Sequence, residues 1–146
     1  MQLLPIKQTA EENTAFTNDQ WYLETIRATI DFYKRVGFMP PWICYFATEN
    51  GKLVGAGGFK GKPANGRVEI AYSTLELYRH QGIGTMICNQ LVTVSLAADP
   101  SVMITARTLR EHNYSVRILK KNNFVFAGTV LDPEDGDVWE WEYKRK

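Results

Sequence analysis

The sequence predicts one domain of mixed α/β (α+β) class, with a mostly antiparallel sheet of about six or seven strands and about four helices. Its 146 residues are 45% hydrophobic and 23% charged, as expected for a single domain with a single core. Apolar runs of strand length alternate with helical runs, and no linker or repeat divides the chain. Asn-Gly pairs at residues 50–51 and 65–66 are typical of tight turns between antiparallel strands. We therefore expect residues 1–146 to form a single domain.

The first half is expected to begin with a short strand at residues 3–7 and to continue into a helical region. Thr9 and Glu12 have the capping-box spacing that starts a helix. The helical pattern then reaches about Val36, with a break near residues 17–19. Further strands are expected at residues 42–48, 53–59 and 67–74.

The second half continues the alternation of helices and strands. A helix is expected from Thr85 to about Ala98. Thr108 and Glu111 form a second capping-box pair, which predicts a helix from about residue 113 to residue 122. Strands are expected at residues 102–106, 124–130 and 138–143.

Residues 79–84 read Arg-His-Gln-Gly-Ile-Gly, between an apolar strand and an expected helix. Glycines at these positions let a ligand approach the backbone. The amides of residues 82–85 would be the unpaired donors of a helix N-terminus, where the partial positive charge favours an anion. With Arg79 beside them, they predict a site for a phosphate-bearing cofactor. The alternative is an ordinary tight turn with an incidental arginine.

Composition argues against several other classes of protein. A net charge of +1 supplies no general attraction for nucleic acid, and no apolar stretch approaches the roughly 20 residues that span a membrane. Cys44 and Cys88 cannot form a disulfide framework, so we expect a reducing compartment and a cytoplasmic location. His80 and His112 lack partners at metal-ligand spacing, so no metal site is expected.

The pattern Arg-x-x-Gly-x-Gly at a strand-to-helix junction resembles motif A of the GNAT acyltransferases, which bind acetyl-CoA through its pyrophosphate. The predicted order of strands and helices also resembles the whole GNAT fold. A second GNAT signature reads Asn-x-x-Ser, then a leucine, a lysine and Gly-Phe. In register with it are Ser115, Leu119, Lys121 and Phe124. His112 stands at the family's asparagine position, with Asn113 one place later, and Asn123 stands at the glycine position.

The resemblance implies an N-acetyltransferase that uses acetyl-CoA as cosubstrate. It implies cofactor contacts at the end of the strand 67–74, in the glycine turn and at the start of the last helix. These candidates are Ser73, Thr74, Leu75, Arg79, Gln81, Gly82, Ile83, Gly84, Thr85, His112 and Asn113. Lys120 and Lys121 are interpreted as a solvated helix end, with contact to a CoA phosphate as the alternative.

Glu69 is the candidate general base, because an amine must lose a proton during acyl transfer. It lies in an otherwise apolar strand just before the glycine turn, where burial would favour a base. In GNAT enzymes a glutamate on this strand often acts through a water, and the resemblance supports that role. The alternative is a structural carboxylate, paired with Arg67 or with a neighbouring strand.

GNAT enzymes polarise the thioester carbonyl with a backbone amide where two strands separate. Counting back from Arg79 places this donor at Thr74, flanked by Ser73 and Leu75. Many relatives protonate the departing thiolate with a tyrosine, but the matching position here is Leu119. Tyr114 is the substitute candidate, with core packing as its alternative role.

We therefore expect direct transfer of an acetyl group to a primary amine, either on a small molecule or at a protein or peptide N-terminus. The transfer would occur in a ternary complex. A non-catalytic acyl-CoA-binding or sensor module is the alternative, and a domain that binds another nucleotide is a third. No nucleic-acid or membrane partner is expected, and the chain is expected to be a monomer or a homodimer.

Overall fold

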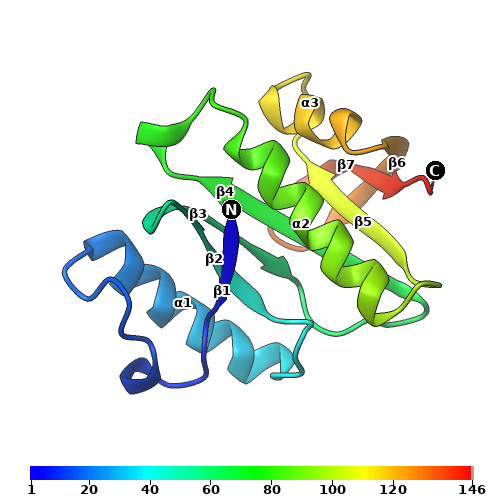
Figure 1. Ribbon diagram of the computed structural model, residues 1–146. Helices are drawn as coiled ribbons and strands as arrows, with labels where there is room; N and C mark the ends of the chain where they lie inside the picture. Colours follow the sequence, from blue (N-terminus) through cyan, green and yellow to red (C-terminus); the bar gives the residue numbers. More distant parts are fainter. Residues whose placement is uncertain (146) are drawn as a thin grey trace.

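The computed structural model describes residues 1–145, which form one seven-stranded sheet with packed helices (Figure 1). The strands are β1 (Gln2–Pro5), β2 (Cys44–Glu49), β3 (Lys52–Phe59), β4 (Arg67–Thr74), β5 (Met103–Thr108), β6 (Phe124–Asp132) and β7 (Gly136–Tyr143). The α-helices of this region are α1 (Gln20–Val36), α2 (Ile83–Ala98) and α3 (Tyr114–Lys121), with 3₁₀ turns at Ala10–Glu12 and Glu76–Tyr78. The order in the sheet is β1-β2-β3-β4-β5-β7-β6. The predicted mixed, mostly antiparallel fold is confirmed, with three α-helices rather than about four.

Both Asn-Gly pairs form the turns that the sequence predicts. Asn50 and Gly51 have φ angles of 53° and 78° and join β2 to β3. Asn65 and Gly66, at 53° and 73°, reverse the chain immediately before β4. Asparagine and glycine tolerate these left-handed conformations better than other residues, so local chemistry fixes both turns.

Neither of the two predicted capping boxes caps an α-helix. Thr9 and Glu12 bond to each other through their side chains, 2.8 Å apart, and only one 3₁₀ turn follows. The long helix α1 begins later, where the Asp19 carboxylate accepts the Tyr22 amide at 2.9 Å. In α3 the cap is Asn113, because the expected cap Thr108 lies within β5.

Helices α1 and α2 cover opposite faces of the sheet. A Cβ added at Gly57 of β3 would meet Ile87 and Leu91 of α2 at 2.7 and 3.1 Å. Ala56, which precedes Gly57 in β3, packs against the cluster that contains Tyr22 and Ile26 of α1. Because successive residues of a strand point to opposite faces, the two helices must lie on opposite sides.

Strands β4 and β5 separate partway along their length. They pair in parallel from Arg67–Ile70 to Met103–Ala106. Beyond Ile70, β4 stays paired with β3 as far as Thr74, whereas β5 continues beside β7 to Thr108. One edge of residues 71–74 therefore has no strand partner within the described chain. We call this opening the β4–β5 fork.

Candidate cofactor and acceptor site

The glycine turn forms a cradle at the start of α2. Gly82 is the N-cap residue and has a left-handed φ of 80°, which a glycine adopts without strain. The first backbone bond of the helix runs from the Met86 amide to the Gly82 carbonyl at 3.1 Å. No side chain caps this end of the helix in the described chain. The preceding amides are therefore available donors at the positive end of the helix dipole.

Gly84 lets two helices approach each other closely beside this cradle. A Cβ at this position would lie 2.6 Å from Cδ1 of Ile118 in α3 and 3.4 Å from Oγ1 of Thr74. Gly84 is buried, so its missing side chain brings α3 against the start of α2. The second motif glycine therefore serves helix packing as well as access to the backbone.

A cavity of about 380 Å³ opens above the cradle, between the end of β4, the start of α2 and one side of α3. We call it the cofactor cavity. Its lining includes six of the predicted site residues: Thr74, Arg79, Gly82, Gly84, Thr85 and Tyr114. It also includes five residues to which the sequence reasoning gave no firm site role: Tyr78, His80, Arg117, Ile118 and Lys121. The positive charges of Arg79, Arg117 and Lys121 suit a phosphorylated ligand.

The helical repeat of α3 could have identified the missed residues. Tyr114, Arg117, Ile118 and Lys121 are spaced by three or four residues, so they share one helix face. The sequence does not say what that face covers. This depends on the packing of α3 on α2 at Gly84, which is a contact between segments far apart in the chain.

The β4–β5 fork meets the cofactor cavity at Thr74. The Leu75 amide donates to Val54 of β3 at 2.9 Å, and the Glu69 carbonyl accepts from the Lys60 amide at 2.8 Å. Because peptide groups alternate along a strand, the amide of Thr74 points away from β3, into the fork. This places one backbone donor at the position where the sequence analysis expects an oxyanion donor.

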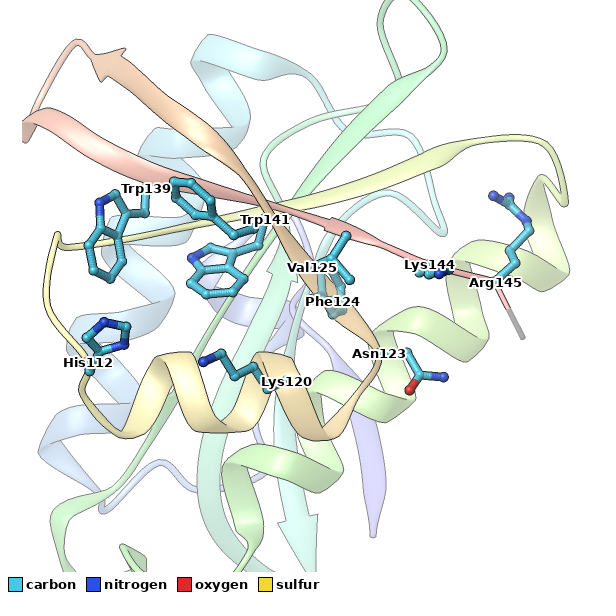
Figure 2. Close-up of a pocket in the computed structure, with 10 residues that line it drawn as sticks. His112, Lys120, Asn123, Phe124, Val125, Trp139, Trp141, Lys144 and Arg145 are labelled. Carbon is cyan, nitrogen blue, oxygen red and sulfur yellow. The ribbon is translucent and has the colours of Figure 1, made fainter.

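The other predicted cofactor residues lie elsewhere. Ile83 is buried in the core, and Gln81 contacts the Leu77 carbonyl at 3.5 Å. The Asn113 side chain caps α3 by accepting the Val116 amide at 3.2 Å. His112 lies in a separate groove beside Trp139 (Figure 2).

Ser73 and Leu75 flank Thr74 without lining the cofactor cavity described above. The amide of Leu75 is used by β3. Ser73 lines a second cavity of about 380 Å³ on the α1 side of the sheet. We call it the acceptor cleft. It is lined mainly by residues of α1, β3 and β4, with Ile6 and with Cys44 of β2: Ile6, Thr25, Thr29, Phe32, Cys44, Ala56, Gly57, Gly58, Phe59, Lys60, Ala71, Tyr72 and Ser73.

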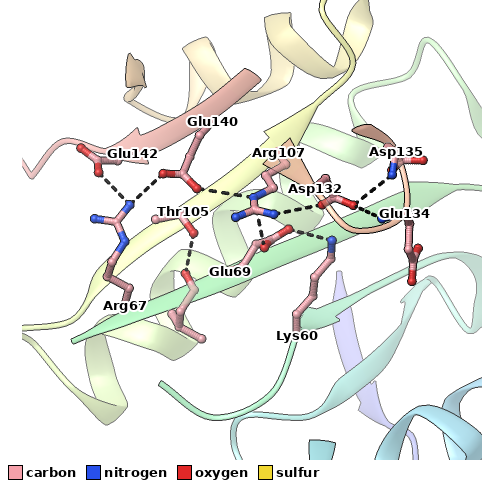
Figure 3. Close-up of polar contacts among 11 residues, drawn as sticks. Lys60, Arg67, Glu69, Thr105, Arg107, Asp132, Glu134, Asp135, Glu140 and Glu142 are labelled. Atoms are coloured by element: carbon pink, nitrogen blue, oxygen red, sulfur yellow. Dashed lines mark hydrogen bonds and ion pairs between the residues drawn. The ribbon is translucent and has the colours of Figure 1, made fainter. Parts of the chain in front are cut away.

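Glu69 is next to the acceptor cleft through its partner Lys60, although it does not line the cleft, and 19% of its side chain is exposed. Its Oε2 pairs with Nζ of the cleft residue Lys60 at 2.7 Å, and its Oε1 lies 3.7 Å from Nε of Arg107 (Figure 3). Glu69 and Ser73 are four positions apart in β4. Because side chains alternate between the two faces of a strand, both point to the α1 face. The carboxylate is thus on the acceptor side of the sheet, with the cofactor cavity on the other side.

Glu69 belongs to a larger ion-pair network that crosses β4, β5 and β7. Arg107 pairs with Asp132 at 3.0 Å and with Glu140 at 3.4 Å. The structural alternative named Arg67 or a neighbouring strand as the partner of Glu69. Arg67 instead pairs with Glu140 and Glu142, whereas the neighbouring strand β5 supplies Arg107 (Figure 3).

Asp132 anchors the far end of the network. The amide of Glu134, the Arg107 guanidinium and the amide of Asp135 donate to this carboxylate and lower its pKa to about 2. Asp132 therefore stays ionised and fixes Arg107 from the side opposite Glu69.

The chain was compared with known proteins. The family model described as Acetyltransferase (GNAT) family matches residues 8–124. Curated protein sequences give no significant match. Among solved structures, spermidine N-acetyltransferase SpeG from Vibrio cholerae superimposes with a TM-score of 0.71 at 12% identity, covering 98% of this chain and 94% of that one.

Two further structures have the same fold. Ribosomal-protein-alanine N-acetyltransferase from Brucella melitensis matches with a TM-score of 0.60 at 20% identity, over 82% of this chain and 76% of that one. RimL, a ribosomal alpha-N-protein acetyltransferase in complex with coenzyme A, matches with a TM-score of 0.64 at 18% identity, over 84% of this chain and 71% of that one. At these identities the likeness shows a shared fold.

Proposed function

Since the chain belongs to the acetyltransferase (GNAT) family and is thereby an acetyltransferase, we propose that it moves an acetyl group from acetyl-CoA to a primary amine. The observation that best supports this proposal is the β4–β5 fork, where the Thr74 amide lies beside the cradle of α2. The cofactor cavity reaches Thr74 from one face of the sheet, and the acceptor cleft reaches the adjacent Ser73 from the other. A cosubstrate can enter from one face and an acceptor from the other. This arrangement suits direct attack in a ternary complex.

In this proposal the cradle and its cations hold the pyrophosphate of acetyl-CoA. The donors are the amides at the start of α2, with Arg79, Arg117 and Lys121 supplying charge. The thioester carbonyl lies in the fork, where the Thr74 amide donates to the developing oxyanion. Nothing in the residues described calls for a metal ion.

Glu69 is proposed as the general base that accepts the amine proton through a water, because it is on the α1 face of the sheet, paired with the cleft residue Lys60, and not against the fork. Tyr114 lines the cofactor cavity and is proposed to protonate the departing thiolate. Free CoA then dissociates, and no covalent enzyme intermediate forms.

The acceptor is proposed to be a small-molecule amine or a protein N-terminus, as the names of the structural relatives indicate for those proteins. The acceptor cleft is mostly apolar and its lining includes Phe32 and Lys60, whose ammonium pairs with Glu69. Cys44 and Cys88 are both free thiols, which supports our proposal of a cytoplasmic location.

The proposal is tested first by calorimetric titration of the protein with acetyl-CoA, CoA and ATP. Both CoA species should bind. Arg79→Gln should lower the affinity for both about tenfold, because the substitution removes a charged donor. Arg27→Gln, which changes an exposed arginine of α1, is the matched control and should bind normally. Binding of ATP alone would move the site to another cofactor class.

Turnover then separates an enzyme from an acyl-CoA-binding module. CoA release is measured with spermidine, an aminoglycoside, and peptides that begin with serine or alanine. Amine-dependent CoA release supports the transferase. Tight acetyl-CoA binding without release across the panel would favour the non-catalytic module.

A further inference from the structure

A large, mostly apolar cavity lies outside the proposed acetyl-transfer site. It has a volume of about 710 Å³ and runs between α3 and the β6–β7 hairpin (Figure 2). We call it the aromatic groove. Its lining is His112, Lys120, Asn123, Phe124, Val125, Phe126, Trp139, Trp141, Lys144 and Arg145. A volume of this size is typical of small-molecule sites.

Aromatic rings form the strand side of the groove. Phe126 lies 5.8 Å from Trp139 and 5.7 Å from Trp141, with the rings edge to face. The Trp141 indole is buried and fixed by a hydrogen bond that its Nε1 donates to Thr108 at 3.0 Å. Phe126, in contrast, is 54% exposed. The groove thus offers an open aromatic surface on a rigid base.

The charged residues that line the groove are all of one sign. Lys120, Lys144 and Arg145 are all cationic, and the residues that line the groove include no aspartate or glutamate. Lys120 reaches back from α3 and places its ammonium 6.0 Å from the centre of the Trp141 ring (Figure 2). Arg145 is held by the carbonyls of Pro100 and Val102.

Neighbouring lysines of α3 serve different cavities. Lys120 lines the aromatic groove, whereas Lys121 lines the cofactor cavity. The two cavities share no lining residue among those described. A ligand in the groove would therefore leave the cofactor cavity free.

We propose that the aromatic groove binds a planar aromatic carboxylate. Its ring lies against Phe126 and Trp139, and its carboxylate accepts a charge-assisted hydrogen bond from Lys120. A cationic ligand at these rings would meet the Lys120 ammonium, and no aspartate or glutamate lines the groove to pair with it. A second copy of this chain, docked groove to groove, would bring the cationic lining residues of both grooves together, which is unfavourable.

The test is calorimetric titration with 2-naphthoate, compared with its uncharged amide, 2-naphthamide. The wild-type protein should bind 2-naphthoate, and the amide should bind about tenfold more weakly or not at all, because it lacks the charge. Lys120→Gln should lower the affinity for 2-naphthoate by about tenfold. Phe126→Ala, which truncates an exposed ring, should also weaken it. Circular dichroism and thermal unfolding verify that each variant is folded.

Lys121→Gln is the matched control, because it removes the adjacent charge from the other cavity. It should leave the affinity for 2-naphthoate unchanged. Absence of binding at 10 mM probe, equal affinity for the amide, or equal losses in the two lysine variants would overturn the proposal. So would a dimer that dissociates on Phe126→Ala, because the groove would then be an interface between copies.

Discussion

At the scale of single residues, the clearest question concerns the Glu69 carboxylate. It has two cationic neighbours, Lys60 and Arg107, and only part of it is exposed. Such a group can bind or relay a proton at the cleft, or it can hold three strands together. Glu142 belongs to the same network through Arg67 and serves as an internal reference.

Glu69→Gln should lower kcat for amine acetylation by about 100-fold or more, since an amide cannot accept the proton. The dissociation constant of acetyl-CoA should change little, because Glu69 lies on the other face of the sheet. Steady-state kinetics and calorimetry measure the two quantities. Glu142→Gln makes the same chemical change in the same network and should leave kcat near the wild-type value. Equal losses in both variants would assign Glu69 a structural role.

Asp132 gives a prediction about pH. Its pKa is lowered to about 2 in the folded protein, from the ordinary value of 3.8. The carboxylate therefore stabilises the fold fully above about pH 4, and this stabilisation is lost as the pH falls through about 2.

Asp132→Asn should therefore reduce the free energy of unfolding near neutral pH by about 1–2 kcal/mol, because charge-assisted hydrogen bonds are lost. The difference between variant and wild type should shrink in acid. Urea unfolding at a series of pH values measures it. A difference that does not depend on pH would show that ionisation of Asp132 contributes nothing to stability.

At the scale of secondary-structure elements, the contact between α2 and α3 determines the shape of the cofactor cavity. Gly84 and Ile118 meet where the two helices come closest, and an added Cβ would overlap Cδ1 of Ile118. The distance between the two helices therefore depends on this pair of residues.

Gly84→Ala should destabilise the protein by about 1 kcal/mol through this overlap, because only the flexible end of the Ile118 side chain has to move. In an Ile118→Val background, which lacks Cδ1, the same substitution should cost less. Chemical unfolding of the four proteins in the double-mutant cycle measures the coupling. Additive effects would mean that the two side chains do not interact.

Local chemistry explains which elements could be predicted from the sequence. The Asn-Gly turns, strand β4 and the glycine turn before α2 depend on residues adjacent in the chain, so their positions were close to those observed. Thr108 failed as a helix cap because Trp141, a distant residue of β7, donates to its hydroxyl within the sheet. A pattern of four consecutive residues contains no information on such a contact.

The same distinction applies to the candidate site. Arg79 and Gly82 belong to one local motif, and the structure places both in the cofactor cavity. Arg117 and Lys121 reach that cavity only because α3 packs on α2. His112 lies beside Trp139 in the aromatic groove, although its position in the second motif suggested cofactor contact.

At the scale of the whole molecule, the sheet consists of two parts that share a short seam. The strands β1–β4 and the strands β5–β7 are joined by the pairing of Arg67–Ile70 with Met103–Ala106. Helix α2 lies close to β3 and β4 and also contacts α3. The cofactor cavity is lined by Thr74 of β4 and by Lys121 of α3, the helix between β5 and β6 in the chain, so a ligand there would contact both sides of the seam.

Acetyl-CoA should therefore stabilise the entire fold and not one part of it. At a concentration 100 times its Kd, it should raise the free energy of unfolding by about 2.7 kcal/mol. Urea unfolding followed by far-ultraviolet circular dichroism and by tryptophan fluorescence should give coincident transitions with and without ligand. Separate transitions would contradict this view, because they would show that the two parts, which each contain two tryptophans, do not unfold together.

The open edge of β4 has a consequence for the exchange of backbone hydrogen with solvent. The amides of Tyr72 and Thr74 point into the fork, where no strand of the described chain pairs with them. Without cosubstrate, these two amides should exchange with deuterium far faster than the amide of Leu75, which is bonded to Val54. An acyl-pantetheine arm that takes the place of the missing strand would slow them selectively. Their exchange rates would then report occupancy of the site directly, without any acceptor amine and without turnover.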